Sequence, residues 1–135
     1  MAASVLVDAS FLVTLLNIRE FNHAWAKDQA TRLPPPWKTC EPVLSEAFHL
    51  LGRYGATSVA SLLTRKALIP AFHLDHDVDA VIKLMEKYGD VPMSLADACL
   101  VRMSEILPDP VVLTTDADFR IYRRHGRQVV PCVTP

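Results

Sequence analysis

Residues 4–16 read SVLVDASFLVTLL, and this stretch decides the fold. Val5 to Val7 form a short apolar run with the character of a buried strand, and Asp8 ends it. The apolar positions between Phe11 and Leu16 then follow the spacing of a helix. A buried strand that leads straight into a helix is typical of parallel sheets, because crossover helices cover the faces of such sheets.

The same alternation of strands and helices continues along the chain. We expect further helices over residues 23–31, 42–53, 57–67, 78–88, 94–107 and 116–124, and strands near residues 38–40, 71–74, 111–113 and 128–133. Short strands between helices predict an α/β fold with a largely parallel sheet covered on both faces. A length of 135 residues suits one domain, which we expect to span residues 1–135.

Composition excludes several classes of protein. Hydrophobic residues make up 50% of the chain and the net charge is −1, which argues against disorder and against a strongly basic nucleic-acid coat. The apolar run from Phe11 to Leu16 is far below the ~20 residues of a membrane span, so we expect no membrane segment. Cys40, Cys99 and Cys132 form no C-x-x-C motif and are typical of buried thiols in a reducing cytoplasm.

Two acids directly follow predicted strands. Asp8 ends the first strand, and Asp116 follows the run Val-Val-Leu-Thr-Thr. Sites in open parallel sheets form at the carboxyl ends of the strands, so these two carboxylates can meet although they lie far apart in the sequence. The alternative is that each acid caps the helix after its strand.

Two further acids lie beside apolar helix faces. On a helical wheel, Glu46 falls at the edge of an apolar arc that includes Leu50, where its carboxylate can face a cleft rather than bulk water. Asp97 lies beside the apolar stripe of its own helix. It also stands three residues after Ser94, which is the spacing of a capping box. For both acids the alternative is a structural role, as a solvated rim glutamate and as a cap.

Four carboxylates that converge on one pocket need a cation. Like charges at close range raise one another's pKa and cost stability unless a positive charge lies between them. Ligands made only of carboxylates select Mg²⁺ or Mn²⁺ over zinc. Such an ion can orient a water molecule and help to deprotonate it.

Four segments of the chain carry these acids: VLVDASFLV at 5–13, SEAFHLL at 45–51, SLADA at 94–98 and LTTDADF at 113–119. In this order they resemble the PIN domain family, in its VapC-type toxin group. The resemblance implies a PIN-like three-layer α/β/α fold with a central, mostly parallel sheet of about five short strands. It also implies a Mg²⁺-dependent endoribonuclease.

The resemblance assigns roles to individual residues. Asp8, Glu46, Asp97 and Asp116 match the acidic quartet of the family, and Asp8 and Asp97 match its usual direct metal ligands. Asp118 lies next to the quartet as a candidate to substitute for Asp116 or assist it. Glu41 is a second acid near the Glu46 motif, and position 46 is favoured by the helical wheel.

The resemblance further implies partners for the chain. From this resemblance we expect the toxin of a toxin–antitoxin pair, which a small antitoxin protein blocks, and we expect a homodimer. We also expect its substrate to be RNA. The preference for RNA over DNA rests on the family alone.

Other interpretations of the acids remain open at this stage. A PIN-like module without catalysis would act only by binding a partner, although the intact quartet argues against this. A receiver-like phosphoacceptor domain also carries aspartates at strand ends. It needs an acidic pair after the first strand, and here Asp8 is followed by Ala9 and Ser10.

A calcium loop is the remaining rival. Asp75, Asp77, Asp79 and Glu86 occupy charged positions of an EF-hand loop, but Ala80 stands where that loop requires glycine. The same stretch has the apolar periodicity of a helix, which explains it better.

Arginines gather near the C-terminal end of the chain, at positions 120, 123, 124 and 127. Arginine clusters suit phosphate contacts, which position a nucleic acid without specifying its sequence. We therefore expect Arg123, Arg124 and Arg127 to bind the substrate, with a solvated surface as the alternative. Tyr122, beside the cluster, is a candidate to stack on a base.

Overall fold

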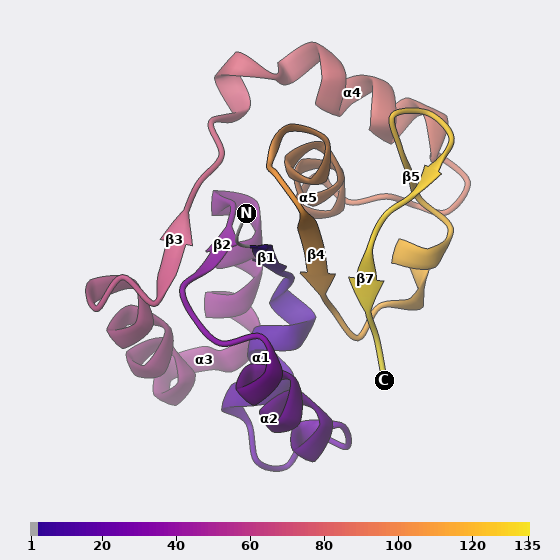
Figure 1. Ribbon diagram of the computed structural model, residues 1–135. Helices are drawn as coiled ribbons and strands as arrows, with labels where there is room; N and C mark the ends of the chain where they lie inside the picture. The colour runs from indigo at the N-terminus through magenta and orange to yellow at the C-terminus, as the bar shows by residue number, and fades with distance from the viewer. Residues whose placement is uncertain (1–2) are drawn as a thin grey trace.

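The computed structural model describes residues 3–135 and contains a five-stranded sheet in which every pair of neighbours is parallel. Figure 1 shows its strands from left to right in the order β3-β2-β1-β4-β7. The strands are β1 (Ser4–Val7), β2 (Trp37–Thr39), β3 (Leu68–Pro70), β4 (Pro110–Leu113) and β7 (Cys132–Val133). A separate antiparallel hairpin consists of β5 (Arg123–Arg124) and β6 (Gln128–Val129).

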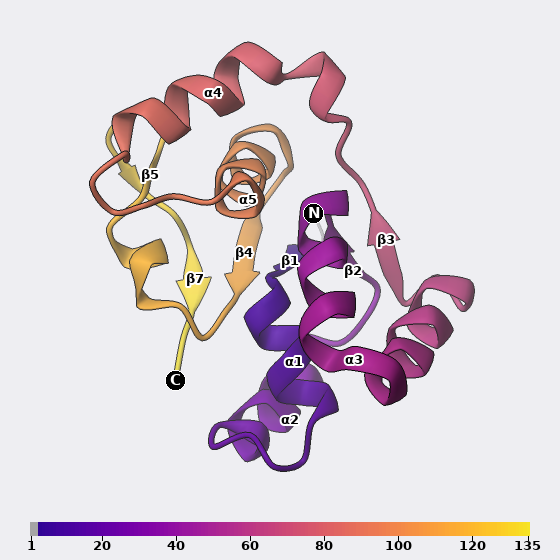
Figure 2. The same cartoon turned by 180° about the vertical axis from the view of Figure 1, so that it is seen from behind.

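Helices flank this sheet, as Figures 1 and 2 show from opposite sides. The α-helices are α1 (Ala9–Leu16), α2 (His23–Arg32), α3 (Glu41–Thr64), α4 (Val78–Lys87) and α5 (Leu95–Ile106). Two short 3₁₀ helices, η1 (Leu74–His76) and η2 (Ala117–Arg120), complete the elements. The predicted α/β fold with a parallel sheet of about five short strands is confirmed.

The order of the strands creates a switch point beside β1. From β1 the chain adds β2 and then β3 toward one edge, and α4 and α5 carry it back to β4 on the other side of β1. Ligands in open α/β sheets bind outside the carboxyl ends of the strands at such a point. The order also differs from the 2-1-3-4-5 order of flavodoxin-like receiver domains, which removes the fold basis of that interpretation.

Several element boundaries differ from the sequence prediction. The strand predicted at 71–74 is wrong: β3 lies earlier, at Leu68–Pro70. The preceding helix ends at Thr64. Lys66 has a positive φ of 64°, which lies outside the right-handed helical region, so the helix cannot include it. The predicted strand 128–133 is interrupted at Pro131 and supplies both β6 and β7. The predicted helix 116–124 is only the single turn η2.

Leu50 is also placed differently from the helical wheel. The wheel predicts Leu50 within the buried arc of α3, but this side chain is 61% exposed. The buried stripe of this part of α3 is narrower and consists of Val43, Leu44 and Ala47, with Leu51 half-buried.

The stretch proposed as a calcium loop is largely helical. Helix α4 begins at Val78, as its periodicity predicts. The Oδ1 atom of Asp77 accepts a hydrogen bond of 2.9 Å from Arg102 Nε, and Arg102 also pairs with Glu105. Asp77 therefore ties the start of α4 to α5.

Two predictions about protein class can be compared with the structure. Within residues 3–135, none of the helices has both the length and the apolarity that crossing a bilayer requires. All three cysteines are free thiols, and Cys40 and Cys99 are fully buried.

Helix α3 is kinked at Gly52, which has φ 67° and ψ −160°. This region of backbone conformation is essentially restricted to glycine.

Gly52→Ala should therefore lower the free energy of unfolding by about 1–3 kcal/mol, although nothing lies within 4 Å of the added Cβ. Urea unfolding measures the change. The matched control is Gly89→Ala, where φ is not positive and the added Cβ makes an ordinary contact of 3.5 Å. Equal stabilities of the two variants would contradict the strain at Gly52.

Candidate active site

Asp8 lies at the switch point of the sheet, one residue beyond β1. Its backbone N–H donates to Leu113 O at 3.0 Å, which holds the end of β1 beside the end of β4. Its carboxylate caps α1, because Oδ1 accepts from Ala9 N at 2.8 Å. Oδ2 accepts from the hydroxyls of Ser10 at 3.0 Å and Thr114 at 2.8 Å. Asp8 therefore does cap α1, as the alternative interpretation of this acid predicts. Residues that follow β1 and β4 both donate hydrogen bonds to its carboxylate.

The environment of Asp8 disfavours its negative charge. The residue is only 4% exposed. Burial raises the pKa of the Asp8 carboxyl to about 6, and the nearby charge of Asp97 adds to the rise, although three hydrogen bonds oppose it. A cation that binds beside such a buried carboxylate would favour its charged form.

Asp97 is the second buried acid and lies in the first turn of α5. It closes a capping box: Ser94 Oγ accepts from Asp97 N at 3.0 Å, and Asp97 Oδ2 accepts from Ser94 N at 3.4 Å. The same Oδ2 accepts a hydrogen bond of 2.9 Å from the Tyr122 hydroxyl. Burial, and after it the charge of Asp116, raises the pKa of the Asp97 carboxyl. As with Asp8, the predicted cap and the electrostatic cluster coexist.

Glu46 and Asp116 approach the same cluster from two other elements. Glu46 is exposed on α3, yet partial desolvation and the charge of Asp97 raise its pKa. Asp116 is half-buried and caps η2 by accepting from Asp118 N at 2.9 Å. Asp97 is therefore electrostatically linked to each of the other three acids of the predicted quartet, from β1, α3 and the end of β4.

Two other acids take different places. Glu41 is exposed at the first residue of α3, where it lines a pocket with Phe72 and Leu95. Asp118 is half-buried in η2. Burial raises the pKa of the Tyr122 hydroxyl, and the charges of Asp97, Asp118 and Asp116 add to this rise. Asp118 is thus close to the cluster, while the electrostatic link to Asp97 favours Glu46 over Glu41.

The cluster suits a hard divalent cation. In the described part of the chain, none of the four acids forms an ion pair with a basic side chain. The donor set is all oxygen, which matches Mg²⁺ or Mn²⁺. No three His, Cys, Asp or Glu side chains within residues 3–135 are arranged so that they could hold a metal ion together. Mg²⁺ needs only one or two carboxylates when water and substrate phosphate complete its shell, so the buried acids Asp8 and Asp97 fit it.

Tyr122 does not have the role that the sequence suggests. It is completely buried and packs edge-to-face against Tyr88 and Phe119, with ring centroids 5.2 Å away in both cases. The prediction that Tyr122 stacks on a base is therefore wrong. Its hydroxyl is instead turned to Asp97, a contact that residue spacing along the chain does not signal.

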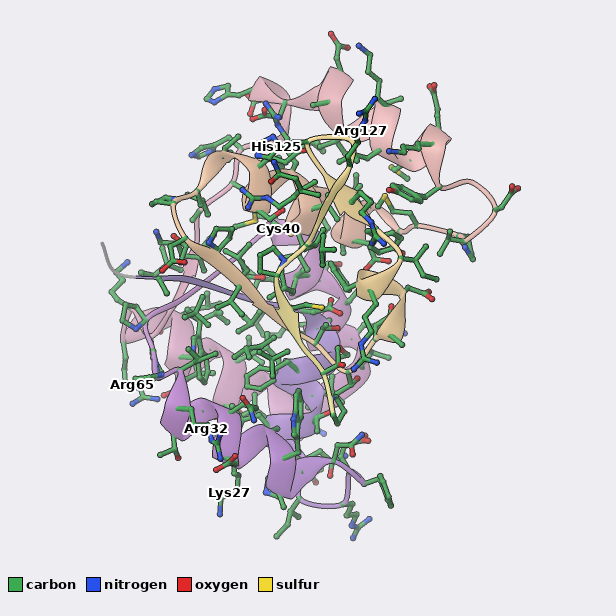
Figure 3. The ribbon with its side chains drawn as sticks, turned by 45° about the vertical axis from the view of Figure 1, so that its right-hand side comes forward. Lys27, Arg32, Cys40, Arg65, His125 and Arg127 are labelled. Atoms are coloured by element: carbon green, nitrogen blue, oxygen red, sulfur yellow. The ribbon has the colours of Figure 1, made fainter. Side chains whose placement is uncertain are left out.

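The predicted arginine cluster lies around the β5–β6 hairpin, and its members differ. Arg123 is half-buried, and its Nη1 donates to the carbonyl oxygens of Arg120, Ile121 and Tyr122. Arg124 Nη2 contacts His125 Nε2 at 3.3 Å. Figure 3 shows Arg127 and His125 at the hairpin, at the opposite end of the molecule from Lys27 and Arg32 of α2.

Comparisons with known proteins bear on the family and the fold. A family model described as the PIN domain matches residues 5–124. The structure is similar to the crystal structure of VapC20 from Mycobacterium tuberculosis, a toxin that cleaves the sarcin–ricin loop. The TM-score is 0.71 at 24% sequence identity, over 85% of this chain and 92% of the other. No curated protein matches the sequence at a significant level.

Proposed function

Because this chain belongs to the PIN domain family, we propose that it is an endoribonuclease that depends on Mg²⁺ or Mn²⁺. The observation that carries the proposal is the set of four acids linked through Asp97 at the switch point of the sheet, without a basic partner in residues 3–135. Such a set repels itself and is best explained as a site for a cation and a phosphate.

Each acid has its own part in this reaction. Asp8 and Asp97 would hold the ion, since they are the two buried members. The bound ion would lower the pKa of water and stabilise the negative charge that develops on the phosphate. Glu46 and Asp116 are more exposed, and their carboxylate oxygens would orient the attacking water and complete the charge of the site. This water would attack the phosphorus in line, and the P–O bond opposite it would break, so that one ribose oxygen leaves and becomes a hydroxyl.

The structural likeness to a toxin supports a biological setting. VapC20 is a toxin that cleaves the sarcin–ricin loop. By analogy, this chain is the toxin of a toxin–antitoxin pair, and a small antitoxin protein blocks it until it is released. The proposal includes a homodimer and a cytoplasmic location, where three free thiols are stable.

A cleavage assay with structured RNAs tests the proposed reaction. The purified chain is incubated with end-labelled hairpins, including the sarcin–ricin loop, in Mg²⁺, in Mn²⁺ and in a chelator, with DNA of the same sequences beside them. Cleavage of RNA in either metal and none in the chelator is the expected result. Cleavage that persists in the chelator would exclude the metal site, and equal cleavage of DNA would exclude the preference for RNA.

The second candidate function is a PIN-like module that binds a partner without catalysis. In that case no hairpin is cut in either metal, and the chain still binds its antitoxin. Asp8→Asn serves as the control in the same assay. Cleavage by the wild type that is absent from Asp8→Asn excludes both a contaminating nuclease and the module without catalysis.

The β5–β6 hairpin should bind the phosphates of the substrate. We expect the double variant Arg124→Ala/Arg127→Ala to bind RNA more weakly and to lower the log–log slope of affinity against salt by roughly one unit per lost phosphate contact. Arg123→Ala is the matched control, because the Arg123 side chain is engaged with backbone carbonyls and should affect stability instead. An unchanged slope in the double variant would assign these arginines to a solvated surface.

A further inference from the structure

Asp97 presents its two carboxylate oxygens differently. Oδ2 accepts from both Ser94 N and the Tyr122 hydroxyl. Among the described residues, Oδ1 takes part in no hydrogen bond or ion pair. Two donors hold Oδ2 from two sides, which restrains the Asp97 side chain. The oxygen without a partner is therefore the one available to a cation.

The Tyr122 hydroxyl makes the shorter of these two bonds, 2.9 Å against 3.4 Å for Ser94 N. A phenol that donates to an ionised carboxylate forms a charge-assisted hydrogen bond, which is stronger than a bond between neutral groups. The distance of 3.4 Å between Ser94 N and Asp97 Oδ2 is long for a hydrogen bond. Tyr122 therefore contributes most of the restraint on the Asp97 side chain.

The position of Tyr122 is itself fixed by its surroundings. The ring is fully buried between Tyr88 and Phe119. Its backbone N–H donates to Asp118 O at 3.2 Å. The ring cannot swing away without opening this packing, so its hydroxyl is a rigid support.

We propose that Tyr122 is a positioning residue for the metal ligand Asp97: its hydroxyl holds Asp97 Oδ2 so that Oδ1 is free to coordinate the cation. The inference rests on the proposed metal site and adds a residue to it. Groups that hydrogen-bond a metal ligand orient it, and removing them costs about 10- to 100-fold in metal affinity or activity. Tyr122 thus acts through Asp97 and not on the RNA.

The test is Mn²⁺ binding by calorimetry, without RNA. Tyr122→Phe keeps the buried ring and removes only the hydroxyl, and we expect its Mn²⁺ affinity to fall by about 10-fold. Tyr88→Phe is the matched control: it removes a buried tyrosine hydroxyl from the same aromatic cluster, one that contacts Arg123 N and not Asp97. Its Mn²⁺ affinity should equal that of the wild type, and thermal melting shows whether both variants are folded.

A second measurement separates positioning from loss of structure. Cleavage by Tyr122→Phe should recover at high Mn²⁺ concentration, because only occupancy of the site is reduced, while Asp97→Asn should not recover. If Tyr122→Phe and the wild type bind Mn²⁺ equally and Asp97→Asn does not bind it, the role of Tyr122 is wrong and the metal site stands. If Asp97→Asn binds Mn²⁺ like the wild type, the metal site itself is wrong. An equal loss of affinity in Tyr88→Phe and Tyr122→Phe would show a packing effect and overturn the inference.

Discussion

Replacing Asp97 by Asn should reduce RNA cleavage by roughly 100- to 1,000-fold, the cost of removing one charge-stabilising group from a site. Asp97 is the acid to which Asp8, Glu46 and Asp116 are all electrostatically linked, so its charge affects the whole cluster. The variant keeps the shape of the side chain and an oxygen that can accept from Tyr122 or Ser94. Initial rates on an end-labelled hairpin at saturating Mn²⁺ measure the loss.

The control for this variant is Ser94→Ala. This variant removes the Ser94 hydroxyl that accepts from Asp97 N, so it breaks the capping box of α5. It leaves the Asp97 carboxylate in place. Loss of such a cap costs about 1 kcal/mol of stability, and cleavage should stay close to that of the wild type. If Ser94→Ala loses as much activity as Asp97→Asn, the effect comes from the helix cap. If Asp97→Asn keeps its activity, the acid is not a metal ligand.

The sequence predicts the frame of the site because the frame depends on local signals. Asp8 and Asp116 follow short apolar runs typical of buried strands, and parallel strands bring their carboxyl ends to one edge. The spacing of Ser94 and Asp97 likewise predicts the capping box found at the start of α5. In these places strand, helix and cap signals all agree with the fold.

The sequence does not predict the contacts made between distant segments. The Tyr122 hydroxyl reaches Asp97 across 25 positions, and no local pattern marks a buried tyrosine as different from one on the surface. Arg123 is similar: it resembles its neighbour Arg124 in the sequence, but only the turn of η2 brings three carbonyl oxygens to its guanidinium. The boundary of β3 depends on the positive φ of Lys66, which propensity does not indicate.

The free energy of unfolding of the metal-free protein should fall by about 2 kcal/mol as the pH rises from 4 to 7, owing to Asp8. Burial and the charge of Asp97 hold the pKa of folded Asp8 at about 6, above its ordinary value of 3.8. Between these values the folded chain keeps a proton that the unfolded chain has lost, so stability is lost as the pH rises through this window. Asp8→Asn cannot ionise and should be more stable than the wild type above pH 6.

Urea unfolding in a chelator at pH 4 and pH 7 measures this difference, with Asp90→Asn as the control for an exposed acid outside the cluster. At pH 7, Mn²⁺ should make the wild type more stable than Asp8→Asn. An ion that binds only the folded state stabilises it by an amount that grows with the concentration of the ion. The wild type should gain stability from Mn²⁺ and Asp8→Asn should gain none. A wild type that is equally stable at both pH values in the chelator would show that the charge of Asp8 is compensated within the protein. The cluster would then need no cation, and the case for a metal site at β1 and β4 would fail together with this prediction.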